Sequence, residues 1–238
     1  MELALIFGAA LWGGVAGVLV PRAAYRLSVE PEEEWRAQCP DGHPISGWVG
    51  WARCAGRAYG PSTTLVVIAT ALVCAALAAA TGTRPELGVW LLIAPFGMLL
   101  TLVDFSVHRL PDVVNLPLAV AVAGLLGIVA LVPEHNGDWT AALLGGLAYA
   151  GWFFVCFLIN PNWVAFGDVK VGLWLGAVLG WYGWGVLMLG AFAGFLLAGI
   201  YAIGLAVRRR AGRKTPVPYG PFLIAGAFVG TLIGAYAA

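Results

Sequence analysis

Long apolar stretches separated by short polar segments dominate the chain. They run over residues 3–21, 62–81, 86–103, 112–132, 140–159, 168–182, 184–207 and 219–237. Most of them approach the roughly 20 residues that an α-helix needs to cross the hydrocarbon core of a bilayer. The pattern therefore predicts an all-α fold, a polytopic bundle of about eight transmembrane helices.

The sixth and seventh stretches are separated only by the residues Trp181-Tyr182-Gly183-Trp184. Trp and Tyr favour the membrane–water interface, so we expect a tight turn at that depth. The alternative is seven spans, with one long tilted helix running through this segment. The first stretch is expected to be a retained helix and not a signal peptide, because Glu2 precedes it and the basic residues follow it.

Composition agrees with a membrane protein. Of the 238 residues 61% are hydrophobic and 11% are charged, and the mean hydropathy is +0.88. Globular domains carry about 25% charged residues, so a soluble domain of any size is excluded. Residues 1–238 are interpreted as a single membrane domain, in which residues 22–61 form a solvated cytoplasmic loop without a strong helix or strand pattern.

The basic residues predict the orientation. With the N-terminus outside and eight spans, all but one of the 13 Lys and Arg fall in inner segments, and only Arg84 falls outside. This asymmetry follows the positive-inside rule and places both termini outside. The basic run 208–214 is interpreted as a topology anchor that attracts anionic lipid. No nucleic-acid partner is expected, because nothing beside this run resembles a base-reading module.

Two aspartates, Asp104 and Asp168, stand at the mouths of predicted spans. Ionisable groups at the edge of a span are costly and indicate function. Both are expected at the cytoplasmic start of a span, where the positive end of the helix dipole stabilises a carboxylate. Two neighbouring carboxylates divide into one charged and one protonated group, which suits peptide hydrolysis. The pair favours an intramembrane aspartyl protease, and the alternative is that each aspartate only caps a helix.

Several neighbours are expected to bind substrate or support the aspartates. Gly167 leaves space for a substrate backbone. Lys170 points away from Asp168 on an ideal helix, toward the interface or an acidic substrate. Asp112, which follows Pro111, fits a capping role. His108 is a candidate hydrogen-bond partner of the aspartates.

Glycines recur every four residues in three of the predicted spans. They are Gly172, Gly176 and Gly180, then Gly190 and Gly194, and finally Gly226, Gly230 and Gly234. Small residues at this spacing allow membrane helices to approach closely. The first set lies on the stripe of its helix that carries Asp168, so close packing is expected on that face.

Four segments resemble the type IV prepilin leader peptidases. Asp104, with Pro111 seven residues later and Asp112, Asn115, Leu116 and Pro117 after it, resembles their first active-site segment. Residues 166–170, Phe-Gly-Asp-Val-Lys, resemble their G-x-G-D motif, with Ala165 in place of the first glycine. Residues 219–223 resemble the start of their last helix, and residues 21–54 a degenerate form of their cytoplasmic cysteine loop.

The resemblance implies a membrane aspartyl endopeptidase of the bacterial inner membrane, with Asp104 and Asp168 as its catalytic pair. The implied substrate is a pilin or pseudopilin precursor, cut at the cytoplasmic face between its basic leader and its apolar helix. The cut needs no cofactor, and S-adenosylmethionine is needed only if N-methylation is retained. The alternatives are another G-x-G-D intramembrane protease, or a non-catalytic membrane scaffold or transporter subunit.

The cysteine loop departs from the family pattern. The family's longer members carry two C-x-x-C pairs, which suit a four-thiolate zinc site. Here the second positions of those pairs are Gly42, after Cys39, and Arg57, after Cys54. We therefore expect no metal site and weak or absent methylation, and the lost spacing argues against His43 as a third ligand. A Cys39–Cys54 disulfide is not expected in a reducing cytosol.

Overall fold

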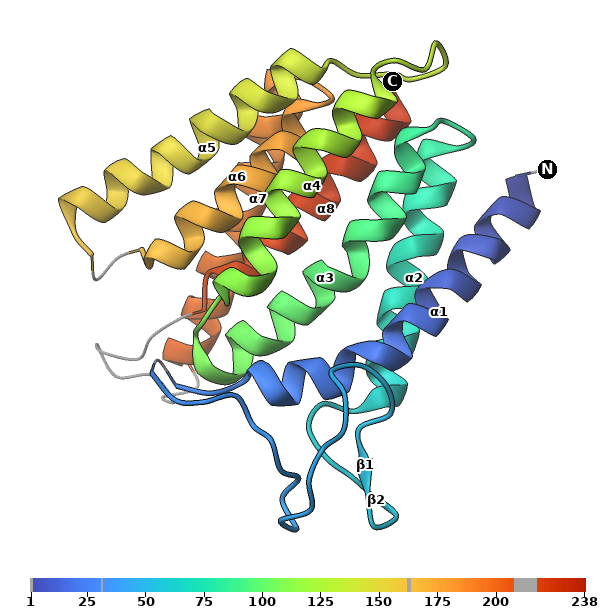
Figure 1. Ribbon diagram of the computed structural model, residues 1–238. Helices are drawn as coiled ribbons and strands as arrows, with labels where there is room; N and C mark the ends of the chain where they lie inside the picture. Colours follow the sequence, from blue (N-terminus) through green and yellow to red (C-terminus); the bar gives the residue numbers. More distant parts are fainter. Residues whose placement is uncertain (1, 31, 162–163, 208–217) are drawn as a thin grey trace. The chain divides into compact units, whose positions relative to one another are not determined.

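The computed structural model describes residues 2–30, 32–161, 164–207 and 218–238 (Figure 1). In these ranges it contains eight α-helices and one two-stranded sheet. Seven of the helices are long and apolar enough to cross a membrane, which confirms the prediction of an all-α polytopic bundle. The elements are α1 (Glu2–Leu27), β1 (Arg53–Cys54), β2 (Arg57–Ala58), α2 (Thr63–Thr81), α3 (Glu86–Val107), α4 (Asp112–Val129), α5 (Trp139–Ile159), α6 (Phe166–Gly180), α7 (Trp184–Val207) and α8 (Gly220–Ala237).

Helix α6 is the short one. Its 15 residues extend about 22 Å, against about 30 Å for a bilayer core. It ends at Gly180, and α7 begins at Trp184 after a turn in which Gly183 has φ +101°. The alternative of one long tilted helix through this segment is therefore wrong. Helices α7 and α8 lie where the seventh and eighth apolar stretches were predicted. The basic run 208–214 lies outside the described residues.

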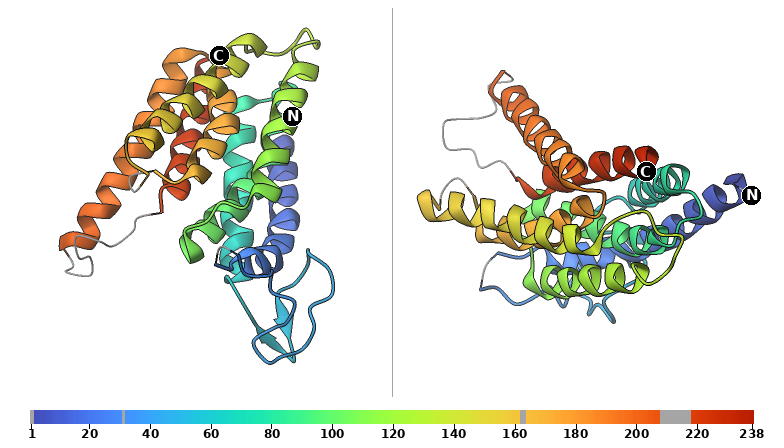
Figure 2. Two further views of the ribbon diagram at one scale, coloured as in Figure 1. Left: turned by 60° about the vertical axis from the view of Figure 1, so that its left-hand side comes forward. Right: turned by 90° about the horizontal axis from the view of Figure 1, so that it is seen from above.

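The chain divides into two compact units, Met1–Pro111 and Asp112–Ala238. The first unit contains α1, α2, α3 and the sheet, and the second contains α4 to α8 (Figure 2). In the first unit α1 lies directly against α2. The approach is so close at Gly13 that an added Cβ atom would be only 2.6 Å from the carbonyl oxygen of Thr70. The indole of Trp12 links α1 to α3 by donating to the carbonyl of Leu91 at 2.9 Å.

In the second unit the glycine stripe after Asp168 packs closely against a neighbouring helix, as predicted, and this neighbour is α5. A Cβ atom on Gly180 would lie 2.6 Å from the carbonyl oxygen of Ala141, and one on Gly172 would lie 3.0 Å from the Cα of Ala150. Such close backbone approach supplies the dispersion energy that apolar burial cannot supply between helices in lipid. It holds the helix that carries Asp168 against a long neighbour.

The other two glycine sets face each other between α7 and α8. A Cβ atom on Gly230 would lie 2.9 Å from the Cα of Gly190, and one on Gly194 would lie 3.1 Å from the carbonyl oxygen of Phe222. One stripe of small residues therefore serves as the contact surface for the other.

Helix α1 continues past its expected end at residue 21 and reaches Leu27. Pro21 lies inside it, where the missing N–H and the ring favour a kink, and Figure 1 shows α1 changing direction toward its end. Two arginines expected in the loop therefore lie on the helix, and they donate to backbone carbonyls of the segment that follows. Arg22 binds Ser46 (2.8 Å), Val49 (3.0 Å) and Trp51 (2.7 Å), and Arg26 binds Arg36 (3.1 Å) and Gly47 (2.6 Å).

The loop, residues 28–62, is more ordered than the sequence indicated. Strands β1 and β2 pair antiparallel around Ala55 and Gly56, whose φ angles of 47° and 79° suit a two-residue hairpin. Cys39, Ala52 and Tyr59 form a small buried cluster. Strands of two residues are too short to show a pattern in the sequence, which is why the hairpin was not predicted.

Candidate functional site

Asp104 lies in the last turn of α3 and is 4% exposed. Its backbone carbonyl accepts a hydrogen bond from the N–H of His108 at 2.9 Å, and His108 ends the helix in the left-handed conformation (φ 51°, ψ 43°). The prediction that Asp104 stands at the start of a span is therefore wrong. It stands at the C-terminal end of a helix, where the partial negative charge of the dipole disfavours an ionised carboxylate. His108 thus ends α3 through its main chain, as the left-handed residue after the last helical turn.

Asp168 is the third residue of α6 and is also 4% exposed. Its Oδ2 atom accepts a hydrogen bond from the backbone N–H of Ala165, the N-cap residue, at 3.0 Å. For this aspartate the predicted position at a helix start is confirmed, and capping is one of its interactions. Both the N–H donor and the positive end of the helix dipole favour the carboxylate in its ionised form.

Lys170 and Asp112 form an ion pair in the second unit. The ammonium nitrogen of Lys170 lies 2.6 Å from each carboxylate oxygen of Asp112, the first residue of α4. One turn further along each helix, the indole of Trp174 donates to the side-chain oxygen of Asn115 at 3.1 Å, and both residues are buried. Two polar links therefore tie the start of α6 to α4. The sequence analysis had given Lys170 and Asp112 separate roles, and it had named Asn115 in the first motif without a role.

The remaining residues predicted to support the aspartates lie at helix starts. Gly167 is half-buried in the first turn of α6, next to Asp168. Pro111 directly precedes α4. Its missing N–H costs nothing there, because the first N–H groups of a helix have no partner within the helix.

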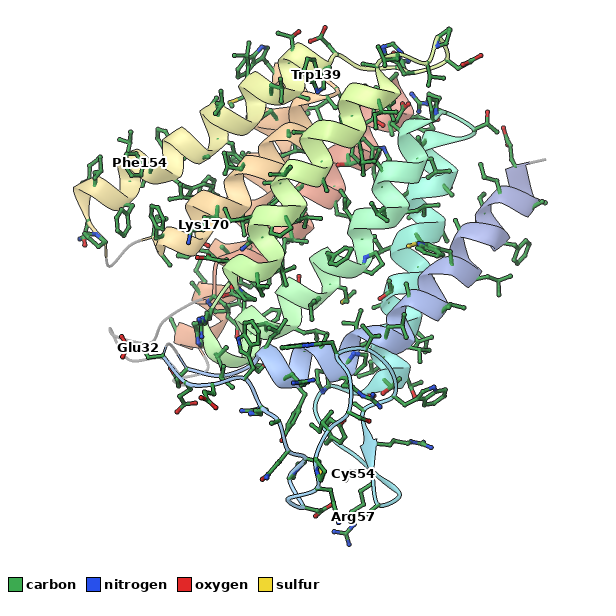
Figure 3. The ribbon with its side chains drawn as sticks, in the orientation of Figure 1. Glu32, Cys54, Arg57, Trp139, Phe154 and Lys170 are labelled. Carbon is green, nitrogen blue, oxygen red and sulfur yellow. The ribbon has the colours of Figure 1, made fainter. Side chains whose placement is uncertain are left out.

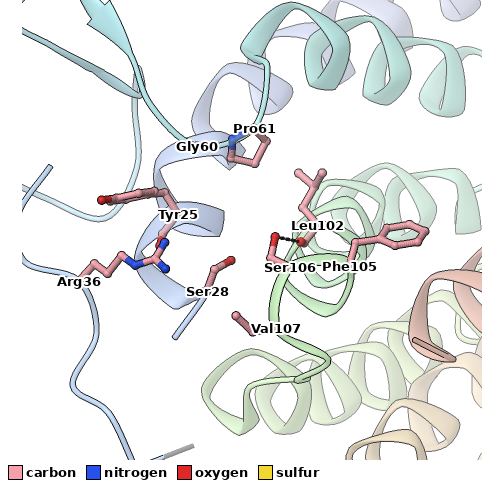
Figure 4. A pocket seen from close by; sticks show the side chains of 9 residues that line it. All are labelled: Tyr25, Ser28, Arg36, Gly60, Pro61, Leu102, Phe105, Ser106 and Val107. Carbon is pink, nitrogen blue, oxygen red and sulfur yellow. Dashed lines mark hydrogen bonds between the residues drawn. The ribbon is translucent and has the colours of Figure 1, made fainter. Parts of the chain in front are cut away.

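A pocket of about 400 Å³ adjoins the end of α3 in the first unit (Figure 4). Its walls come from α3, from the end of α1 and from the loop, through Leu102, Phe105, Ser106, Val107, Tyr25, Ser28, Arg36, Gly60 and Pro61. The guanidinium of Arg36 lies 4.7 Å from the ring centre of Tyr25. The pocket was not predicted, because it combines three segments that are far apart in the sequence. One of its walls is the helical turn that carries Asp104.

Four possible metal ligands converge in the loop. One donor atom from each of Cys39, Asp41, His43 and Cys54 lies within 4.8 Å of all the others. Both cysteines are free thiols, and Figure 3 labels Cys54 and Arg57 near the tip of the loop. The expectation of a missing site rested on cysteine spacing alone. The fold adds an imidazole and a carboxylate, so that reasoning no longer holds.

The two thiols of this cluster ionise differently. Burial opposes ionisation of Cys39, but hydrogen bonds from the Cys54 thiol, the His43 side chain and the backbone N–H groups of His43 and Asp41 outweigh burial and lower the pKa of Cys39 to about 7. The hydrogen bond to Cys39 is the largest cause that raises the pKa of Cys54 to about 11, followed by burial. Cys39 is therefore the thiol of this pair that ionises first as the pH rises.

Comparison of the chain with known proteins identifies its family. Residues 91–203, which contain both Asp104 and Asp168, match the type IV leader peptidase family. The chain is 26% identical to the prepilin leader peptidase/N-methyltransferase of Pseudomonas aeruginosa, over 98% of this chain and 91% of that protein. It is 34% identical to the leader peptidase HopD of Escherichia coli, over 58% of this chain and 88% of that protein. No solved structure matches the chain.

Proposed function

The chain belongs to the type IV leader peptidase family, and from this premise we propose that it removes the basic leader from pilin or pseudopilin precursors as a membrane aspartyl endopeptidase. The observation that carries the proposal is that the family match contains two buried aspartates, Asp104 and Asp168, each at the end of a helix. Two carboxylates suffice to hydrolyse a peptide bond without a cofactor. S-adenosylmethionine enters only if the N-methylation named for several relatives is retained.

The two helix ends suggest a division of labour between the aspartates. Asp168, at the positive end of α6 and bonded to the N–H of Ala165, is the ionised group and takes a proton from the attacking water. Asp104, at the negative end of α3, retains its proton and donates it to the substrate carbonyl oxygen. When the resulting diol collapses, the proton held by Asp168 passes to the leaving amine, and a hydroxyl group of the diol returns a proton to Asp104 as the carbonyl re-forms. Asp168 is then ionised and Asp104 protonated again.

The residues around Asp168 have positioning roles in this proposal. The ion pair between Lys170 and Asp112 and the hydrogen bond between Trp174 and Asn115 hold the first turn of α6 against α4. Gly167 leaves the approach to the carboxylate free of a side chain, so that an extended substrate backbone can reach it.

We further infer that both aspartates act at the cytoplasmic face of the bacterial inner membrane, with both termini outside. The support is the distribution of Lys and Arg along the chain. Reporter fusions after Thr81, Arg109, Asp138 and Arg210 are expected to read outside, inside, outside and inside. A cytoplasmic signal at Asp138 would overturn this topology.

The decisive experiment is cleavage of a purified pilin precursor by the full chain in detergent. The wild type is expected to cut at the junction between leader and apolar helix, and the double variant Asp104→Asn/Asp168→Asn to leave the precursor intact. Asp138→Asn is the matched control, because Asp138 caps α5 by accepting from the N–H of Ala141, a role that Asn can also fill. An uncut precursor with the wild type, or a cut one with the double variant, would refute the proposal.

The same assay separates the alternatives. Another G-x-G-D protease would cut within the apolar helix, which sequencing of the product's N-terminus would reveal. A scaffold or transporter subunit would not cut at all. The mass of the product shows whether a methyl group has been added.

A further inference from the structure

We propose that the loop binds one zinc ion through Cys39, Asp41, His43 and Cys54. The donor set consists of two sulfurs, one imidazole nitrogen and one carboxylate oxygen, all within 4.8 Å of one another. Thiolate and imidazole donors select zinc over the hard cations calcium and magnesium, which prefer oxygen ligands. Gly42 and Arg57 stand at the second positions of the C-x-x-C spacing and offer no thiolate, and the fold brings Asp41 and His43 to the two cysteines in their stead.

The distances between the donors suit a tetrahedral ion. Zinc–sulfur bonds of about 2.3 Å and zinc–nitrogen bonds of about 2.0 Å place sulfur and nitrogen roughly 3.5 Å apart. The Nδ1 atom of His43 lies 3.3 Å from the sulfur of Cys54 and 3.7 Å from that of Cys39. The two sulfurs are 2.6 Å apart and must separate by about 1 Å to admit the ion. A side-chain rotation suffices for a displacement of that size.

The backbone presents the donors from two tight turns. In the first, the N–H of Cys39 donates to the carbonyl of His43, and the N–H of Gly42 donates to the carbonyl of Cys39, both at 2.9 Å. Gly42 has φ +82°, so Gly in place of a second cysteine favours the turn that brings Asp41 and His43 back toward Cys39. The second turn is the β1–β2 hairpin, which carries Cys54 at the end of β1.

Helix α1 holds the chain on both sides of the first turn. Arg22 and Arg26 hold the loop between them by hydrogen bonds to carbonyls of residues 36 to 51. These hydrogen bonds already offset part of the conformational entropy that is lost when the loop becomes ordered. Less of the free energy of metal binding is then needed to order the loop. Cys39 lies on the buried side of the site, while Asp41 and His43 are exposed, so the ion has a path from solvent.

The test uses the purified full chain in detergent and needs no peptidase activity. Wild-type protein, prepared anaerobically and loaded with zinc, is expected to retain about one ion per chain after desalting. Cys39→Ser and His43→Ala are expected to weaken zinc binding by roughly a hundredfold or more, because a structural site divides its affinity among four ligands. Asp41→Asn is expected to weaken it less, since an amide oxygen is a poorer ligand than a carboxylate. Cys156→Ser, which removes a thiol from α5, is the matched control and is expected to bind zinc as the wild type does.

Replacement of zinc by cobalt gives a second readout. An intense sulfur-to-cobalt absorption band is expected in the wild type and in Cys156→Ser, and is expected to weaken in Cys39→Ser and Cys54→Ser. His43 and Asp41 are exposed, so their variants test the site without disturbing the apolar cluster of the loop. Zinc retention by His43→Ala equal to that of the wild type, no retention by the wild type, or a Cys39–Cys54 disulfide in the anaerobic protein would each overturn the proposal.

Discussion

Asp104 and Asp168 are the same residue type and are equally buried, yet they stand at opposite ends of their helices. Asp168 begins α6, where the dipole and the N–H of Ala165 favour negative charge. Asp104 ends α3, where the dipole opposes it. An aspartyl protease needs one charged and one protonated carboxylate, and in the proposed mechanism the opposite helix ends favour that difference.

The two aspartates also differ in how their helices are held. The start of α6 is held by glycine contacts with α5 and by the Lys170–Asp112 pair. The end of α3 is closed by the left-handed residue His108, and Arg109, just beyond it, donates to the carbonyl of Glu30 in the loop at 3.1 Å. Glycine packing thus supports the helix of one carboxylate, and a left-handed residue ends the helix of the other.

The largest expected effect comes from replacing the aspartates singly. Asp104→Asn and Asp168→Asn are each expected to lower the cleavage rate by about 10²- to 10⁴-fold, as for loss of a general acid or base. The loss should be deeper at position 168, because the Asn amide can still donate a hydrogen bond to a carbonyl but cannot accept a proton from water. Single-turnover cleavage of a pilin precursor measures both rates. A deeper loss at position 104 would reverse the assignment of roles.

The next effect concerns packing of the helix that carries Asp168. A Cβ atom on Gly176 would lie 2.7 Å from the Cβ of Tyr149 and 2.9 Å from the Cα of Gly146, so Gly176→Ala is expected to force α5 and α6 apart. The expected cost is about 1–3 kcal/mol, seen as a lower thermal unfolding midpoint in detergent. Gly88→Ala on α3 is the control, because nothing lies within 4 Å of its added Cβ atom, and it should not lower the midpoint. Equal unfolding midpoints for the two variants would contradict the claim that close glycine packing against α5 holds the helix that carries Asp168.

A smaller effect is expected from the Lys170–Asp112 pair. The Asp112 side chain is 55% exposed, and solvent-screened pairs contribute about 0–1 kcal/mol. Lys170→Gln and Asp112→Asn are each expected to slow cleavage by about two- to fivefold, and the double variant should be no slower than either one. Multiplicative losses in this cycle would show that the two residues act separately, for example with Lys170 on the substrate.

The smallest effect is expected at His108. Glycine adopts the left-handed conformation without strain, so His108→Gly should preserve cleavage and raise stability by up to about 1 kcal/mol. His108→Val, with a β-branched side chain in that conformation, should lower stability instead. If His108→Gly abolished cleavage while the protein stayed folded, the imidazole would have to serve the aspartates directly.

The sequence alone determined the approximate helices, the close packing of the glycine stripes and the family. Each backbone N–H and C=O in lipid must be satisfied within its own helix, so a span is a local property that an apolar stretch reveals. Glycine contacts follow from a fixed periodicity in the same way. The motifs around Asp104 and Asp168 are short and contiguous, which is why they were recognisable without a structure.

Only the tertiary structure decided which end of a helix each motif occupies and which side chains meet. The left-handed turn at His108 places Asp104 at a helix end, and no apolar pattern encodes a single residue's φ angle. Lys170 meets Asp112 across 58 residues, and Cys54 meets His43 across 11, because the chain reverses between them. Such contacts depend on where separate segments pack. The spacing of cysteines therefore did not reveal that Asp41 and His43 join Cys39 and Cys54 in one cluster.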